Sequence, residues 1–216
     1  MRILFYGLSL LISSLSFGQT LYASMLLQRF THYAISAQHT WQVPGMAVAI
    51  IEQGKLVYAR GFGVRNNKNQ PVTPNTIFDI ASLTKSFSAT LLAHQIDQGK
   101  YTWNTKITQL YPSFKLYSTY ATKHFAVRDL VAHDSGLPPD ALSALGNFGY
   151  GVDHTLYALR FIKPIAPFRH QFAYQDSFLE VAKKIIEQTN GHTFSETLHS
   201  VLFTPLGMTR SFKGSA

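Results

Sequence analysis

The chain has 216 residues, and its hydrophobic content of 46% is enough for one globular domain with a full core. It contains no cysteine, which excludes disulfides and thiolate chemistry. The formal net charge is +8, but no dense run of Lys and Arg and no nucleic-acid-binding motif accompanies it, so no nucleic-acid partner is predicted. Attraction to anionic surfaces is the milder interpretation of the charge.

The N-terminus has the pattern of an export signal. Arg2 precedes an apolar run from Ile3 to about Leu15, and residues 16–18 place small side chains at the two positions that a signal peptidase inspects. We predict a signal peptide over residues 1–18; a retained anchor is the alternative, although the run is short for a membrane span. The sequence therefore predicts a periplasmic or secreted protein with no stable membrane anchor after cleavage.

The next segment predicts a helix and a hairpin. Apolar residues recur at helical spacing over residues 24–39, and "VPG" at 43–45 ends that helix. The strands are expected over Met46–Glu52 and Lys55–Gly61, joined by a turn at Gln53-Gly54.

A second helix is expected from Ser82 to Gln98, ended by Gly99. Its predicted buried stripe is made of Leu83, Phe87, Leu91 and Ile96. Residues 100–125 look irregular and residues 137–151 look like a loop, with a short helix between them that stops at Gly136.

The C-terminal part predicts two further helices. "SFLEVAKKIIEQTNG" begins with a capping box of Ser177 and Glu180 and ends at Asn190-Gly191. Its inward face is expected to hold Phe178, Val181, Ala182, Ile185 and Ile186. Thr193 and Glu196 repeat the capping box for a last helix, which is broken at Pro205.

The stretch "IASLTKSFSATLLAHQ" places the hydroxyl of Ser82 three residues before the amine of Lys85. Residues three apart on a helix share a face, so the two side chains can meet. A lysine held among apolar groups loses affinity for its proton and can act as base toward a serine, which is a poor nucleophile alone. Taken alone this pattern is common, and a surface helix turn explains it equally well.

Further motifs accompany Ser82. They are "DLVAHDSGLP" at 129–138, "APFRHQFAYQD" at 166–176 and "PLGM" at 205–208, together with the hairpin "PGMAVAIIEQGKLVYARGFGV". With "DIASLTKSF", their order and spacing resemble the serine hydrolases of the class C β-lactamase and penicillin-binding-protein family, over roughly residues 38–208. The resemblance implies an α+β, β-lactamase/transpeptidase-like fold, with an antiparallel sheet flanked by helices.

The resemblance also implies roles for residues. Ser82 matches the acylated nucleophile, and its N–H matches half of the oxyanion hole. Lys85 matches the base partner, and Tyr174 matches the tyrosine of a Tyr-x-Asn motif that moves a proton to the leaving group or from water. The substrates implied are β-lactams, wall-peptide D-amino-acid amides or small esters, with no cofactor. The residues alone do not choose among these substrates.

Other interpretations stand beside these roles. Tyr174 taken alone suits a core tyrosine with a satisfied hydroxyl. His133 and Asp134 could form a dyad, but the resemblance assigns their loop a structural role. Arg169 is expected to pair with a buried acid or carbonyl rather than with substrate. The nine histidines show no H-E-x-x-H motif or tight cluster, so no metal site is predicted.

Asp176 departs from the family pattern, because it stands at the substrate-binding third position of Tyr-x-Asn. An asparagine amide can donate a hydrogen bond to a substrate carbonyl, and an ionised carboxylate cannot. A carboxylate near Lys85 would also favour the charged form of the amine and weaken it as a base. The alternative is that Asp176 simply suits the positive end of the following helix.

The sequence given ends at Ala216, soon after "PLGM". The resemblance implies a longer domain, with a Lys/His-x-Gly motif, a second oxyanion N–H and further sheet strands. We therefore expect residues 19–216 to be a truncated domain with absent or very slow turnover; a partner chain that supplies the rest is the less favoured alternative. A non-catalytic remnant or binding module is the rival to an impaired hydrolase.

Overall fold

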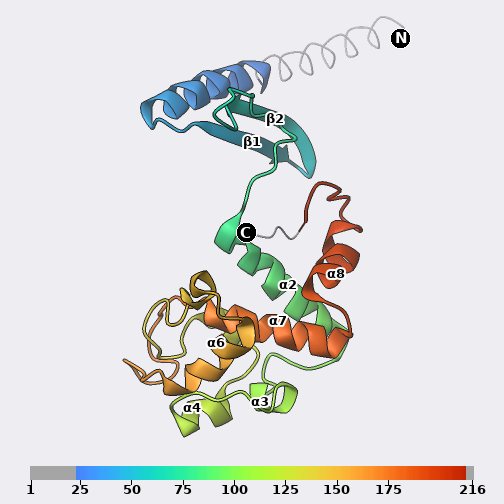
Figure 1. Ribbon diagram of the computed structural model, residues 1–216. Helices are drawn as coiled ribbons and strands as arrows, with labels where there is room; N and C mark the ends of the chain where they lie inside the picture. The colour runs from blue at the N-terminus through green and yellow to red at the C-terminus, as the bar shows by residue number, and fades with distance from the viewer. Residues whose placement is uncertain (1–22, 213–216) are drawn as a thin grey trace, which may run out of the picture. The chain divides into compact units, whose positions relative to one another are not determined.

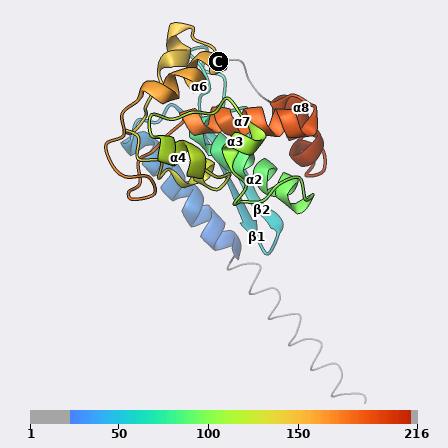
Figure 2. The same ribbon diagram turned by 90° about the horizontal axis from the view of Figure 1, so that it is seen from below.

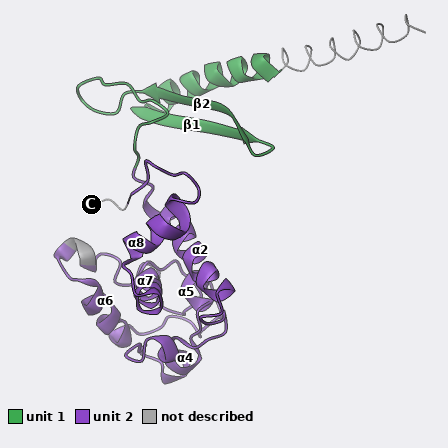
Figure 3. Ribbon diagram, turned by 90° about the vertical axis from the view of Figure 1, so that its right-hand side faces the viewer, with its two compact units in different colours: residues 1–78 green, residues 79–216 purple. Residues whose placement is uncertain are grey.

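A computed structural model of the protein describes residues 23–212, without the side chains of residues 146 and 147. The chain divides into two compact units, one ending at Phe78 and the other beginning at Asp79 (Figure 3). The predicted signal peptide over residues 1–18 lies outside the described residues. Among the helices that are described, none combines the length and apolarity that a membrane span requires.

The first unit is a helix over residues 23–40 packed on a hairpin (Figure 1). Strand β1, Gly45–Glu52, pairs antiparallel with β2, Lys55–Gly63, which confirms the predicted hairpin. Both turn residues have positive φ, 49° at Gln53 and 75° at Gly54, as a tight hairpin turn that matches the strand twist requires. Phe30 of the helix meets Tyr58 of β2 edge to face, with ring centroids 5.6 Å apart.

The second unit is helical and is built around α7, Ser177–Asn190. This helix packs against α2, α6 and α8 (Figures 1 and 2) and against α5 (Figure 3). The five residues predicted to face inward from α7 are all buried. The other helices are α2 (Thr84–Asp97), α3 (Ile107–Leu110), α4 (Thr119–His124), α5 (Asp129–Ala132), α6 (Val152–Ala158) and α8 (Phe194–Leu198).

Short helical turns complete the second unit. Three are of the 3-10 type, η1 (Ala81–Leu83), η2 (Leu145–Phe148) and η3 (Leu159–Phe161). The last, η4 (His199–Phe203), is a π-helical turn that continues α8.

The start of the predicted Ser82 helix is wrong. Ser82 lies in the 3-10 turn η1, and α2 begins only at Thr84. Leu83, which also lies in this turn, is 70% exposed and is not part of the buried stripe. Leu91 is fully buried as predicted, while Phe87 and Ile96 are partly buried against the core. At the other end Gly99 adopts a φ of 73°, which suits a residue just past a helix.

One predicted capping box is wrong and the other is confirmed. Ser177 is the first residue of α7 rather than its cap, and its hydroxyl donates to the Ala141 carbonyl at 2.5 Å. Glu180 accepts instead from Lys183, at 2.6 Å. In α8 the box is present, because Thr193 accepts from the Glu196 N–H and the Glu196 carboxylate accepts from the Thr193 N–H.

The prediction that residues 100–125 are irregular is wrong, because α3 and α4 lie there. These helices have four and six residues, which is too few for an apolar periodicity to appear in the sequence. The start of α4 is fixed by Ser118, whose hydroxyl accepts from the Ala121 N–H at 3.2 Å.

Candidate active site

The structure brings three of the predicted site residues together within the second unit. The Lys85 Nζ donates to the Ser82 Oγ at 2.9 Å. The Tyr174 hydroxyl donates to the same oxygen at 2.7 Å, from a segment 92 residues further along the chain. Ser82 sits in the first turn ahead of α2, where backbone N–H groups lack partners inside the helix.

The segment that carries Tyr174 is held by backbone bonds on both sides. The Ala173 N–H donates to the His133 carbonyl at 2.7 Å, and the Tyr174 carbonyl accepts from the Asp140 N–H at 2.8 Å. The Gln175 side chain is fully buried and its Nε2 donates to the Pro138 carbonyl. The backbone on both sides of Tyr174 is thus fixed by hydrogen bonds, and the Tyr174 side chain extends from it toward Ser82.

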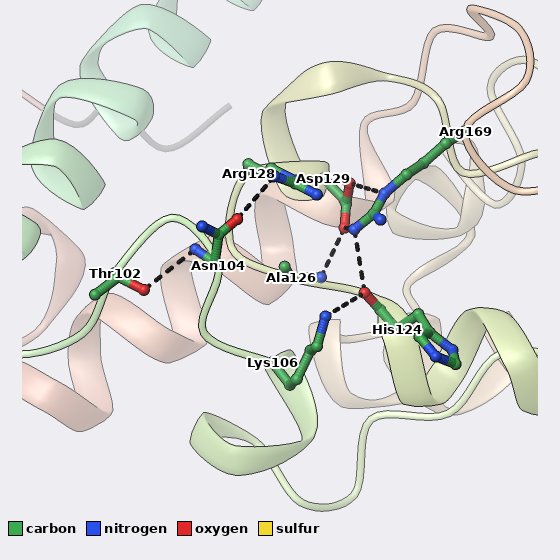
Figure 4. A network of polar contacts seen from close by, with 8 residues as sticks. All are labelled: Thr102, Asn104, Lys106, His124, Ala126, Arg128, Asp129 and Arg169. Atoms are coloured by element: carbon green, nitrogen blue, oxygen red, sulfur yellow. Dashed lines mark hydrogen bonds and ion pairs between the residues drawn. The ribbon is translucent and has the colours of Figure 1, made fainter.

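An ion pair between a buried carboxylate and a partly exposed guanidinium anchors the same segment further upstream (Figure 4). Arg169 donates to both carboxylate oxygens of Asp129, at 2.8 and 2.7 Å, and also to the His124 carbonyl at 3.2 Å. Asp129 is 1% exposed and also accepts from the Ala126 N–H at 2.7 Å. The expected pairing of Arg169 is therefore confirmed for both kinds of partner, an acid and a carbonyl.

Asp176 lies beside Lys85 and forms an ion pair with it. Burial lowers the pKa of Lys85, but the hydrogen bonds and charges of Asp176 and Tyr174 outweigh that effect and raise it above its ordinary value. The apolar surroundings therefore do not lower the pKa of Lys85 overall. The direction of the shift is the one expected from a carboxylate close to the amine. Asp176 also stands directly before α7, where its side chain makes no capping hydrogen bond but its negative charge suits the positive end of the helix.

Sequence reasoning missed the contact between His133 and Tyr174. The two rings stack with centroids 4.9 Å apart and an angle of 27° between their planes. His133 has a positive φ of 58°, a backbone conformation that the residue type does not reveal. The only signal in the sequence was the pair His133-Asp134, which drew attention to a different kind of site.

A cavity of about 430 Å³ adjoins Asp176. Its lining includes Asp176, Ser177, Tyr150 and Val152, together with the charged residues of α7, Glu180, Lys183, Lys184 and Glu187. Ser82 and Lys85 do not line it. Among the residues that the structure describes, no three His, Cys, Asp or Glu side chains lie close enough together to hold a metal ion.

Comparison with known proteins gives relatives along most of the chain. The unguisins hydrolase ungD′ of Aspergillus campestris is 28% identical over 193 residues, which are 86% of this chain and 36% of the relative. Penicillin-binding protein 4 of Amycolatopsis lactamdurans is 26% identical over 82% of this chain and 46% of the relative. The chain thus spans less than half the length of these relatives.

Solved structures show the same fold. The octameric penicillin-binding protein homologue from Pyrococcus abyssi matches 85% of this chain and 43% of its own, with a TM-score of 0.73 and 26% identity. FmtA from Staphylococcus aureus matches 82% of this chain and 49% of its own, with a TM-score of 0.68 and 26% identity. These matches confirm the predicted α+β, β-lactamase-like fold class. The family model described as Beta-lactamase matches residues 34–216, and the chain belongs to this family.

Proposed function

We propose that the protein is a serine hydrolase that works through an acyl-enzyme on Ser82. The observation that carries this proposal is the pair of hydrogen bonds to the Ser82 oxygen, from an amine and from a phenol. Acyl transfer needs a nucleophile with a base in reach and a second group for the proton of the leaving atom. The relatives named as a hydrolase and as penicillin-binding proteins support the same class of reaction.

In the proposed reaction, Lys85 in its neutral form takes the proton of the Ser82 hydroxyl while Oγ attacks the substrate carbonyl carbon. The carbonyl π bond breaks and its electron pair moves to the oxygen, where the Ser82 N–H stabilises the negative charge. The bond to the leaving nitrogen or oxygen then breaks, and that atom takes a proton from Tyr174, which is reprotonated from Lys85. Water repeats the sequence on the acyl-enzyme and releases the acid.

Asp176 tunes this reaction in two ways in our proposal. Its ion pair holds Lys85 charged, and a charged amine cannot accept the Ser82 proton, so we expect slow acylation at neutral pH. Its carboxylate also lines the neighbouring cavity, where it can accept hydrogen bonds from a substrate but cannot donate them. Substrates that offer an N–H to this position are therefore preferred over plain esters, which favours β-lactams and D-amino-acid peptide amides with an amide side chain.

The test is the purified protein with a chromogenic β-lactam, a D-amino-acid peptide amide and a short-chain ester, each compared with Ser82→Ala. Slow release of product that disappears in Ser82→Ala supports a hydrolase. Labelling of Ser82 without turnover supports the rival, a non-catalytic remnant or binding module. No Ser82-dependent reaction with any of the three would refute the proposal.

Asp176→Asn is expected to speed acylation. Removing the carboxylate removes a cause of the raised Lys85 pKa, and the amide can donate to a substrate carbonyl. The neutral, basic form of Lys85 is a minor fraction below its pKa and grows as pH rises, so the acylation rate should rise with pH, and Asp176→Asn should move this rise toward lower pH. The measurement is the rate of labelling by a fluorescent penicillin between pH 6 and 11. A slower variant with an unmoved profile would show that Asp176 has another role.

A further inference from the structure

We infer that His133 is the positioning residue that aims Tyr174 at Ser82, and that protonation of its imidazole releases Tyr174. The inference rests on the proposed function, since it concerns the phenol that serves Ser82. It goes beyond that function because it assigns a role to a histidine of the loop after α5. It also predicts a second decrease of the acylation rate, at acidic pH, in addition to the decrease caused by Lys85.

His133 contacts three consecutive residues of the segment that carries the phenol. Its carbonyl accepts from the Ala173 N–H at 2.7 Å, and its Nδ1 accepts from the Gln175 N–H at 3.1 Å. Between these two bonds its ring lies against the Tyr174 ring. The histidine thus fixes the backbone on either side of Tyr174 and also one face of the phenol.

The histidine is itself held in place. Its ring meets Phe172 edge to face, with centroids 5.5 Å apart, so aromatic groups contact it from two directions. Its backbone is left-handed, with φ 58° and ψ 36°, which turns the chain sharply after α5. Gly136 continues this turn with a φ of 83°, and a Cβ there would collide with the Ala166 carbonyl. The loop therefore lies close against residues 165–167, just upstream of Tyr174.

The hydrogen bond to Gln175 fixes the protonation state of the ring. A backbone N–H can only donate, so Nδ1 must carry a lone pair and the ring must be neutral. The charged groups that act on His133 are Lys85 and Asp176 across the site and Asp134 beside it. Burial, and then the positive charge of Lys85, lower the pKa of His133, while the two carboxylates oppose this.

Protonation would remove the acceptor of the Gln175 N–H and place a second cation near the Lys85 ammonium. Tyr174 would then lose both the backbone bond beside it and a neutral stacking partner. Because the pKa is lowered, this happens only in acid, below the ordinary histidine value of about 6.5. As pH falls, the fraction of neutral Lys85 decreases, and the acylation rate of Ser82 should decrease with it. Below the pKa of His133, protonation of the imidazole should make the acylation rate fall more steeply.

The experiment compares His133→Phe and His133→Asn with the unchanged protein. The phenylalanine keeps a ring but has no acceptor, and we expect acylation of Ser82 to slow on the order of 100-fold, as for a misplaced reacting group. Asparagine tolerates the left-handed backbone and offers an acceptor that does not titrate. It should lose less rate than phenylalanine, and the steeper acid fall should disappear. The matched control is His170→Asn, an exposed histidine on the same segment, which should leave the rate and profile unchanged.

A double-mutant cycle separates positioning from a general effect on the fold. In a Tyr174→Phe background, His133→Phe should change the acylation rate by no more than about twofold, because the group on which it acts is gone. A full loss in that background, an unchanged rate in His133→Phe, or an acid limb that survives in His133→Asn would each overturn the inference.

A readout without catalysis keeps this inference apart from the proposed function. In NMR spectra the Gln175 amide and the Tyr174 ring signals should move together as pH falls through the His133 pKa, and His133→Asn should abolish the shift. If Ser82 is not acylated at all, the proposed function fails, and these signals still decide whether His133 holds Tyr174. Signals that do not respond to His133 would overturn the inference even in an active protein.

Discussion

Replacing Lys85 by methionine is expected to slow acylation of Ser82 by about 100- to 10,000-fold, the usual contribution of a positioned acid or base. Methionine keeps an unbranched side chain of similar length and lacks the amine that bonds to the Ser82 Oγ. Asp176 loses its ion-pair partner, but its side chain is 44% exposed, so water can solvate the carboxylate and the fold should persist.

The measurement is the labelling rate with a fluorescent penicillin and with an activated ester at fixed pH. Lys123→Met is the matched control, because Lys123 is an exposed lysine in the last turn of α4 and takes no part in the contacts of Ser82 or in the lining of the cavity at Asp176. It should label at the unchanged rate. Rapid labelling of Lys85→Met at Ser82 would contradict the role of Lys85 as base and transfer that role to Tyr174.

Asp129→Ala is expected to lower the free energy of unfolding by about 3 kcal/mol, the lower end of the range for breaking a buried ion pair. The removed carboxylate is buried and accepts from Arg169 twice and from the Ala126 N–H. Arg169 is 31% exposed, so water can replace part of what its guanidinium loses. The segment that leads to Tyr174 loses its anchor, so the acylation rate should fall as well.

Denaturant unfolding of the full chain measures the loss. Asp153→Ala is the control, because Asp153 also pairs with a cation, Lys184, but its side chain is 75% exposed. Such a surface pair contributes no more than about 1 kcal/mol. Equal losses in the two variants would contradict the account of a buried anchor.

The elements that sequence predicts well are those with a long periodic pattern. The hairpin emerges from two strand-like apolar runs on either side of a Gln-Gly turn, and α7 emerges from a clean apolar stripe. The start of α2 does not, since nothing in "ASLTK" distinguishes a 3-10 turn from an α-helical one. Ser177 shows the limit of cap motifs, because its hydroxyl finds a partner in Ala141, 36 residues away, that no local pattern reveals.

The residues of the candidate site likewise divide into those that local sequence reveals and those whose position depends on long-range packing. The spacing of Ser82 and Lys85 is local and could be read from the sequence. Tyr174 came from a family resemblance, because its position opposite Ser82 depends on how two distant segments pack. His133 was assigned only a structural role, since its contact with Tyr174 follows from a left-handed backbone and a loop closed over Gly136.

The most direct test of the account is to find the atom that becomes acylated. The protein is treated with a penicillin, digested with trypsin, and its peptides are examined by mass spectrometry. The account predicts the mass of the whole opened penicillin on the peptide from Asn69 to Lys85, located at Ser82 by fragmentation and absent in Ser82→Ala. A label on any other residue, or an equal label in Ser82→Ala, would contradict the claim that Ser82 is the nucleophile.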